Sequence, residues 1–118
     1  MNKDWVQTTK DLSTALKDLR GGAPAVMQGF SAIAQAALKA NALDTKTKEL
    51  IALAIAVATR CDGCIAFHAE AAVKQGASRE EVLETMGMAI YMGAGPSVMY
   101  AAQALEAFDQ FQELKKPA

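Results

Sequence analysis

The residues best suited to chemistry are two cysteines and a histidine that lie close together in the chain. Cys61 and Cys64, the only two cysteines, are three residues apart, and His68, the only histidine, follows four residues after Cys64. Because an α-helix turns once in about 3.6 residues, these positions share one face of a helix. The spacing therefore predicts two thiols and an imidazole that can meet on a single helix.

Such a cluster is typical of thiol redox chemistry. A thiol reacts as its thiolate, and the amides at a helix N-terminus together with a nearby proton acceptor favour that form. His68 can accept the proton or pair with the thiolate, while Cys61 is close enough to Cys64 to close a disulfide. A peroxide attacked by one thiolate would leave a sulfenic acid, which the second cysteine would convert to a disulfide.

Two residues inside the motif affect this chemistry. Gly63 relaxes the backbone where the sulfurs must approach each other. Asp62 is expected to cap the helix, although its negative charge also opposes thiolate formation.

Glu49 is a further candidate, because it opens an apolar helical stripe that continues through Leu53 and Ala56. An inward carboxylate on this stripe needs a partner. The residues alone favour the other interpretation, a solvated glutamate in a first helical turn, flanked by Lys46 and Lys48.

The periodicity of the apolar residues predicts six helices, and no segment alternates with the period of a strand. Local signals mark the ends of the helices: Pro24 suits a first turn, Asp44 an N-cap, Gly76 a helix end, and Ser78 with Glu81 a capping box. The expected helices cover about 4–20, 24–41 and 46–59, a fourth from within 60–64 to 75, a fifth from 78 to a break at 93–96, and a sixth over 96–114. The third is apolar on nearly every side from Leu50 onward, so we expect other helices to surround it. The chain is thus predicted to be one all-α domain over residues 1–118.

Composition excludes several classes of partner. The chain has 12 Lys and Arg against 13 Asp and Glu, without a concentration of either sign that would bind nucleic acid or an anionic membrane surface. Met1 to Trp5 lacks the apolar core of a signal peptide, and the longest apolar stretch, Leu50 to Thr59, is far shorter than the ~20 residues that cross a bilayer. We therefore expect a soluble, cytoplasmic protein. In that reducing compartment, a lone close pair of cysteines is more often catalytic or metal-binding than a structural staple.

The apolar fraction of 52% is high for 118 residues, which predicts that some apolar surface is buried between subunits of a homo-oligomer. A structural oligomer with idle cysteines is one alternative function. A metal-binding module is another: Cys61, Cys64 and His68 would need a fourth zinc ligand from Glu49, Asp62, water or another subunit. A thioredoxin-type protein is disfavoured, because that fold places its C-x-x-C near a βαβ unit.

At Glu49 and over Cys61 to His68 the chain resembles the AhpD-like alkylhydroperoxidases of the carboxymuconolactone decarboxylase superfamily. Their signature has a glutamate twelve residues before a C-x-x-C and a histidine four residues after it, and all these elements are in register here. The likeness extends from roughly Pro24 to Leu105. It departs at Gly63, where the best-known members often carry a relay histidine.

The resemblance implies an all-helical homo-trimer or homo-hexamer and a peroxidase that needs no cofactor or metal. Cys64 would attack the hydroperoxide, Cys61 would resolve the product to a disulfide, and Glu49 with His68 would form the proton relay, which favours the inward position of Glu49. A thiol reductant, either a lipoylated or a thioredoxin-like protein, would restore the thiols. The decarboxylase branch lacks the cysteine pair, which argues against lactone decarboxylation. A general disulfide oxidoreductase, acting on a disulfide substrate, is the alternative.

Overall fold

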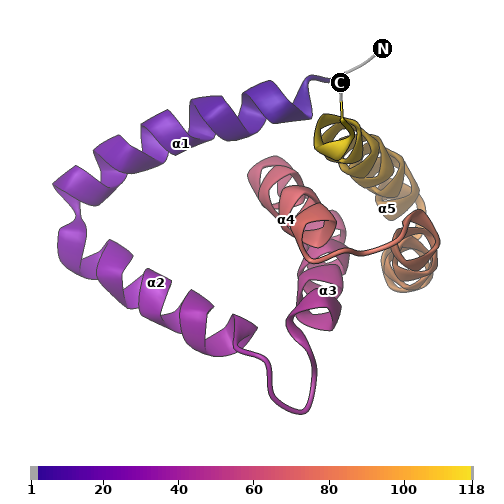
Figure 1. Ribbon diagram of the computed structural model, residues 1–118, viewed down its shortest axis with the longest axis horizontal. Coiled ribbons are helices and arrows are strands. Elements are labelled where there is room, and N and C mark those ends of the chain that lie inside the picture. The colour runs from indigo at the N-terminus through magenta and orange to yellow at the C-terminus, as the bar shows by residue number, and fades with distance from the viewer. Residues whose placement is uncertain (1–2, 118) are drawn as a thin grey trace.

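The structure, a computed structural model that describes residues 3–117, consists of helices joined by short links (Figure 1). The helices are α1 (Trp5–Gly22), α2 (Pro24–Leu38), α3 (Thr45–Ala58), α4 (Asp62–Lys74) and α5 (Arg79–Lys115), and no strand occurs between residues 3 and 117. The all-α prediction is confirmed. Met1, Asn2 and Ala118, which belong to the expected domain, lie outside the described residues.

Helix α5 is bent into two arms, which correspond to the last two of the six expected helices. Ala94, at φ 59° and ψ −148°, leaves the helical conformation within the predicted break. Arg79 donates hydrogen bonds of 3.0 and 3.2 Å to Asp109, so arm 79–93 and arm 95–115 run side by side in opposite directions. Gly93 permits the bend, because a Cβ at this position would lie 1.9 Å from the Oγ of buried Ser97.

The signals read from the sequence do mark the helix ends. The Asp44 carboxylate accepts a 2.7 Å hydrogen bond from the Thr47 amide, and hydrogen bonding by Thr47 lowers the pKa of Asp44. Ser78 and Glu81 form both halves of a capping box at the start of α5. Gly76, at φ 79°, ends α4 in the left-handed conformation that glycine adopts without strain.

The core lies among α3, α4 and α5, and α1 contributes to it chiefly through Trp5. Figure 1 shows α1 and α2 as the two arms of a V beside this core. No residue of α2 is buried. The largest fully buried side chains are Trp5, Leu53, Val57, Ile65, Val82 and Phe108.

The expectation that helices surround α3 on all sides is wrong for a single chain. Ile51 is 44% exposed and Ile55 56% exposed. The reason is the position of α2, which is tied to α3 at their connecting loop, where the Thr45 hydroxyl donates a 3.1 Å hydrogen bond to the Leu38 carbonyl. One apolar face of α3 is therefore left uncovered.

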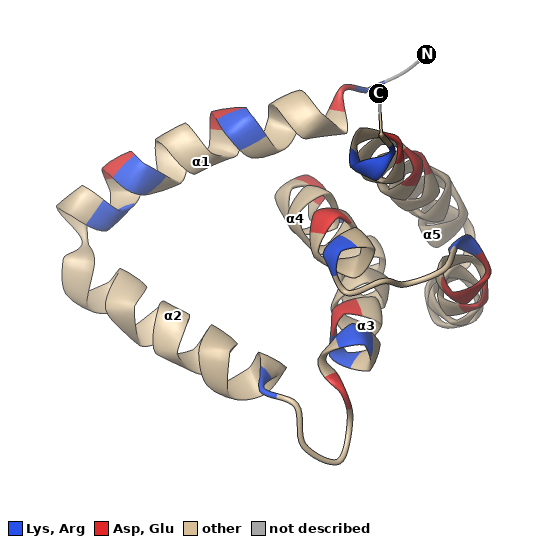
Figure 2. Ribbon diagram, viewed as in Figure 1, with Lys and Arg blue, Asp and Glu red and all other residues tan. Residues whose placement is uncertain are grey.

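Helix α2 is uncharged along its length, whereas α1 carries both signs (Figure 2). Its exposed side chains include Val26, Phe30 and Ile33, which are 71%, 63% and 67% exposed. Within residues 3–117, no helix is long and apolar enough to cross a membrane.

We expect Ser78→Ala to lower the free energy of unfolding by about 1 kcal/mol, because the amide of Glu81 would lose the hydroxyl that accepts its hydrogen bond. Urea denaturation at a fixed protein concentration measures this change. Ser13→Ala, an exposed position inside α1, is the matched control and should alter stability by no more than about 0.5 kcal/mol. Equal effects at the two positions would contradict the role of the cap.

Candidate active site

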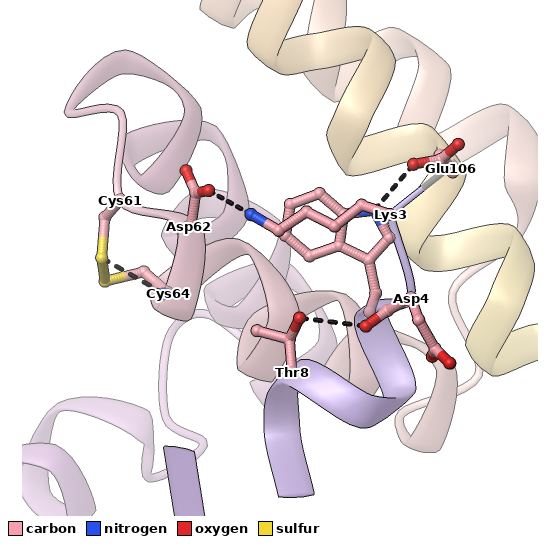
Figure 3. Close-up of polar contacts among 8 residues, drawn as sticks. Lys3, Asp4, Thr8, Cys61, Asp62, Cys64 and Glu106 are labelled. Atoms are coloured by element: carbon pink, nitrogen blue, oxygen red, sulfur yellow. Dashed lines mark hydrogen bonds and ion pairs between the residues drawn. A yellow bond between two sulfur atoms is a disulfide. The ribbon is translucent and has the colours of Figure 1, made fainter. Parts of the chain in front are cut away.

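The two cysteines lie at the N-terminus of α4 and are joined in a disulfide, with Cα atoms 5.2 Å apart (Figure 3). Cys61 is the N-cap residue, in an extended conformation, and its Sγ accepts a 3.2 Å hydrogen bond from the Cys64 amide. Both cysteines are half-buried. The first-turn amides of α4 are thus directed at sulfur, and they would stabilise a thiolate at this position after reduction.

The prediction that Asp62 caps α4 is wrong. An N-cap residue needs an extended backbone, and Cys61 has it, at φ −103° and ψ 98°; Asp62 is the first residue of the helix itself. The Asp62 carboxylate instead forms an ion pair with the Lys3 ammonium. Its charge still lies in the first turn, where the helix dipole favours an anion.

Glu49 points inward and His68 is its partner. The Glu49 residue is only 5% exposed, and its Oε1 lies 2.7 Å from His68 Nδ1, which joins the first turns of α3 to the middle of α4. The solvated position that the residues alone favoured is therefore wrong, and the inward position implied by the resemblance is correct. The reason is the apolar stripe of α3, which turns toward the core at Leu53 and Ala56.

The hydrogen bond to Glu49 also selects the tautomer of His68. An ionised carboxylate has no proton to donate, so Nδ1 carries the hydrogen and Nε2 keeps its lone pair. The His68 side chain is 32% exposed, one turn after Cys64 on the same helix. A buried carboxylate thus orients an imidazole whose other nitrogen can accept a proton.

Three residues in or just before α1 lie next to the C-x-x-C motif, although no feature of the sequence predicted this position. Lys3 pairs with Asp62, and a Cβ at position 63 would lie 2.9 Å from Leu12 Cδ1. Trp5 is fully buried, and its ring lies 4.6 Å from the Lys3 Nζ. The contacts of Lys3 with Asp62 and of Leu12 with position 63 join residues more than fifty positions apart, beyond the reach of helical periodicity.

The metal-binding alternative finds no ligand set in this part of the molecule. Between residues 3 and 117, no group of three or more His, Cys, Asp or Glu side chains is arranged to hold a metal ion. Cys61 and Cys64 are committed to each other, and His68 to Glu49.

We expect NMR to show that the neutral imidazole of His68 is the Nδ1–H tautomer, because Nδ1 faces the Glu49 carboxylate. Glu49→Leu removes the acceptor and should shift the ring toward the Nε2–H tautomer. Because His68 is the only histidine, its ¹⁵N signals need no assignment by mutation. Glu70→Leu on the same helix, whose carboxylate pairs with Lys74, is the control and should leave the tautomer unchanged. The same tautomer in Glu49→Leu and in the unaltered protein would contradict this account.

Comparisons with known proteins agree on one family. The family model described as "Carboxymuconolactone decarboxylase family" matches residues 24–107. A solved structure of a protein of that family from Legionella pneumophila is 59% identical, covers 92% of this chain and 96% of its own, and superposes with a TM-score of 0.89. A family member from Thermotoga maritima, for which a part in an antioxidative response has been suggested, is 27% identical with a TM-score of 0.77, over 96% of this chain and 93% of its own.

An uncharacterised protein of Cupriavidus necator is 41% identical over 108 residues, which cover 86% of this chain and 96% of that protein. The family match spans the paired cysteines, His68 and Glu49 together. This chain belongs to the carboxymuconolactone decarboxylase family.

Proposed function

We propose that this protein is a thiol-dependent peroxidase that reduces hydroperoxides through the Cys61–Cys64 pair. The observation that carries the proposal is the joint geometry of the motif: a disulfide at a helix N-terminus with a buried carboxylate–imidazole pair one turn further on. Membership of the family and the antioxidative role suggested for the Thermotoga maritima protein support it.

In the reduced protein, His68 takes the proton of the Cys64 thiol at Nε2, and Glu49 stabilises the resulting imidazolium. The thiolate attacks the terminal oxygen of the hydroperoxide. The S–O bond forms as the O–O bond breaks, and the departing alkoxide takes the proton from His68. The products of this step are an alcohol and the sulfenic acid of Cys64.

Cys61 completes the cycle as the resolving cysteine. Its sulfur attacks the sulfenic sulfur of Cys64, the S–S bond forms, and the hydroxyl group leaves as water after taking the proton of the Cys61 thiol. One hydroperoxide and two thiols thus give one alcohol, one water and the disulfide. A dithiol reductant, of the lipoylated or thioredoxin-like class, then returns two electrons and two protons, which suits a cytoplasmic protein.

A general disulfide oxidoreductase is the second candidate, and one observation favours it. The Sγ of Cys61, at the N-cap of α4, accepts a hydrogen bond from the Cys64 amide. A thiolate at a helix N-terminus is stabilised, which suits the attacking cysteine of thiol–disulfide exchange. In that case Cys61 attacks a disulfide of the substrate to form a mixed disulfide. Cys64 then attacks the Cys61 sulfur, which forms the Cys61–Cys64 disulfide and releases the reduced substrate.

The two functions predict different products in single-cysteine variants. We expect Cys61→Ser to form a Cys64 sulfenic acid with one equivalent of hydroperoxide, trapped by dimedone and detected by mass spectrometry. Cys64→Ser should form none at a comparable rate, because its remaining thiol lies one turn further from His68. Steady-state peroxide consumption with a dithiol reductant should fall to the level of the doubly substituted, thiol-free protein in both variants.

Full peroxide consumption in both single variants would sink the peroxidase proposal. If the unaltered protein consumes no peroxide but exchanges rapidly with a model disulfide, the oxidoreductase function replaces it. Sulfenic acid at Cys61 alone would reverse the two roles.

We also propose that the protein is a homo-oligomer, a trimer or hexamer, in which a second copy covers α2. An uncharged helix with no buried residue and three large side chains more than 60% exposed gains little from folding alone. The uncovered Ile51 and Ile55 of α3 add to the same apolar surplus. A face of this composition is typical of permanent subunit interfaces, whose centres lack charged residues.

The double variant Phe30→Glu/Ile33→Glu should dissociate the oligomer, because burying two carboxylates without partners costs far more than the interface gains there. Light scattering at micromolar concentration should then give the 12.5 kDa mass of one chain. Gln28→Glu/Ser31→Glu adds the same charge at exposed polar positions of α2 and should keep the larger mass. A monomeric unaltered protein would refute the assembly, and an unchanged mass in the Phe30/Ile33 variant would exclude α2 from the interface.

A further inference from the structure

The N-terminal segment is fastened beside the cysteine pair by contacts with α5. The Lys3 carbonyl accepts a 2.6 Å hydrogen bond from the Gln110 side-chain amide. The Oε1 of the same side chain accepts a 2.7 Å hydrogen bond from the backbone amide of Trp5. The Trp5 indole donates a 2.9 Å hydrogen bond to Glu106, and the whole residue is buried. The backbone of Lys3 is therefore positioned by α5, independently of whether Cys61 and Cys64 are oxidised.

From this position the Lys3 side chain crosses to α4. Its ammonium passes over the Trp5 ring, with Nζ 4.6 Å from the centroid, and pairs with the carboxylate of Asp62 (Figure 3). Asp62 is the only acidic residue inside the C-x-x-C, and the cation that pairs with it comes from the residue two positions before α1. The Lys3 and Asp62 side chains are 35% and 43% exposed, so water screens the pair without abolishing it.

The charge of Asp62 matters because the reactive form of either cysteine is an anion. A carboxylate one or two residues away raises the free energy of a thiolate, and a cation that pairs with the carboxylate cancels most of that effect. At a separation of about 8 Å in a water-like dielectric, one uncompensated charge changes the thiolate fraction by about twofold.

We propose that Lys3 is a positioning residue for the redox pair: by neutralising Asp62 it keeps the thiolate form of the cysteines accessible near neutral pH. Its consequence for turnover rests on the proposed peroxidase function, whereas its effect on thiol ionisation is independent of any substrate. The other charged groups around the pair are Arg60, which precedes Cys61, the Glu49–His68 pair on α3 and α4, and Glu106 of α5 at Trp5. They are the same in every variant used below.

The test measures how fast iodoacetamide alkylates the fully reduced protein as a function of pH. In Lys3→Met, the profile should move to higher pH, with alkylation about twofold slower on its rising limb, because Asp62 loses its cation. Lys3→Arg keeps the charge and should restore the profile. Lys3→Met/Asp62→Asn removes both charges together and should also return it to that of the unaltered protein. Lys17→Met, an exposed lysine further along α1, is the matched control and should change nothing.

A purely structural role for Lys3 gives a different pattern. It would lower the thermal stability of Lys3→Met and leave the alkylation profile in place, which would overturn the inference. A profile that stays shifted in Lys3→Met/Asp62→Asn would overturn it as well, since no carboxylate then remains to be neutralised. If the profiles behave as expected but the protein consumes no peroxide, the proposed function fails and the role of Lys3 stands.

Discussion

A carboxylate buried in the first turns of α3 sets the strongest constraint on this fold. Glu49 is 5% exposed, and an ionised carboxylate without a partner at such a depth costs several kcal/mol. The only histidine of the chain meets this demand from α4, at 2.7 Å. A hydrogen bond between two side chains on different helices allows little rotation of either helix. The face that His68 occupies on α4 is therefore fixed, and with it the direction of Cys64, one turn earlier.

The short link between α3 and α4 completes this arrangement. Only Thr59, Arg60 and Cys61 separate the two helices, and Arg60 reverses the chain at φ 57°. The Cys61 amide then donates a 3.0 Å hydrogen bond to the Ala56 carbonyl in the last turn of α3. Cys61 cannot drift from the end of α4 without breaking this bond, so its sulfur stays at the N-cap, over the first-turn amides. The turn before α4 thus fixes the position of the Cys61 sulfur, and the Glu49–His68 pair fixes the helix face that carries the Cys64 sulfur.

Features that depend on neighbours in sequence could be predicted, and those that depend on distant residues could not. Asp44 and Ser78 begin helices and Gly76 ends one, all through contacts within four residues, so their residue types are enough to predict these helix boundaries. Asp62 has the right type for a cap as well. It fails because Lys3, 59 residues away, is available to pair with it and because Cys61 takes the extended conformation.

Glu49 illustrates the same limit from another side. Its flanking lysines favoured solvent, and only the resemblance to a family indicated the partner 19 residues further on. Periodicity likewise recognised the apolar character of Ile51 and Ile55 but could not tell whether the same chain would cover them. An apolar face predicts that burial occurs, and the identity of the covering surface depends on the topology of the whole assembly.

Gly63 connects these constraints to the chemistry. Where related proteins often carry a second relay histidine, this chain has no side chain, and Leu12 of α1 packs so closely that a Cβ there would lie 2.9 Å from its Cδ1. The space beside the second cysteine is therefore occupied by an apolar group from another helix. In the proposed mechanism, proton transfer would then depend on the single imidazole of His68, and Lys3, just before α1, would control the local charge through its ion pair with Asp62. If the proposed role of Lys3 holds, this family member would activate its thiols with one imidazole and a cation that lies beside the motif, in place of a second titratable side chain within it.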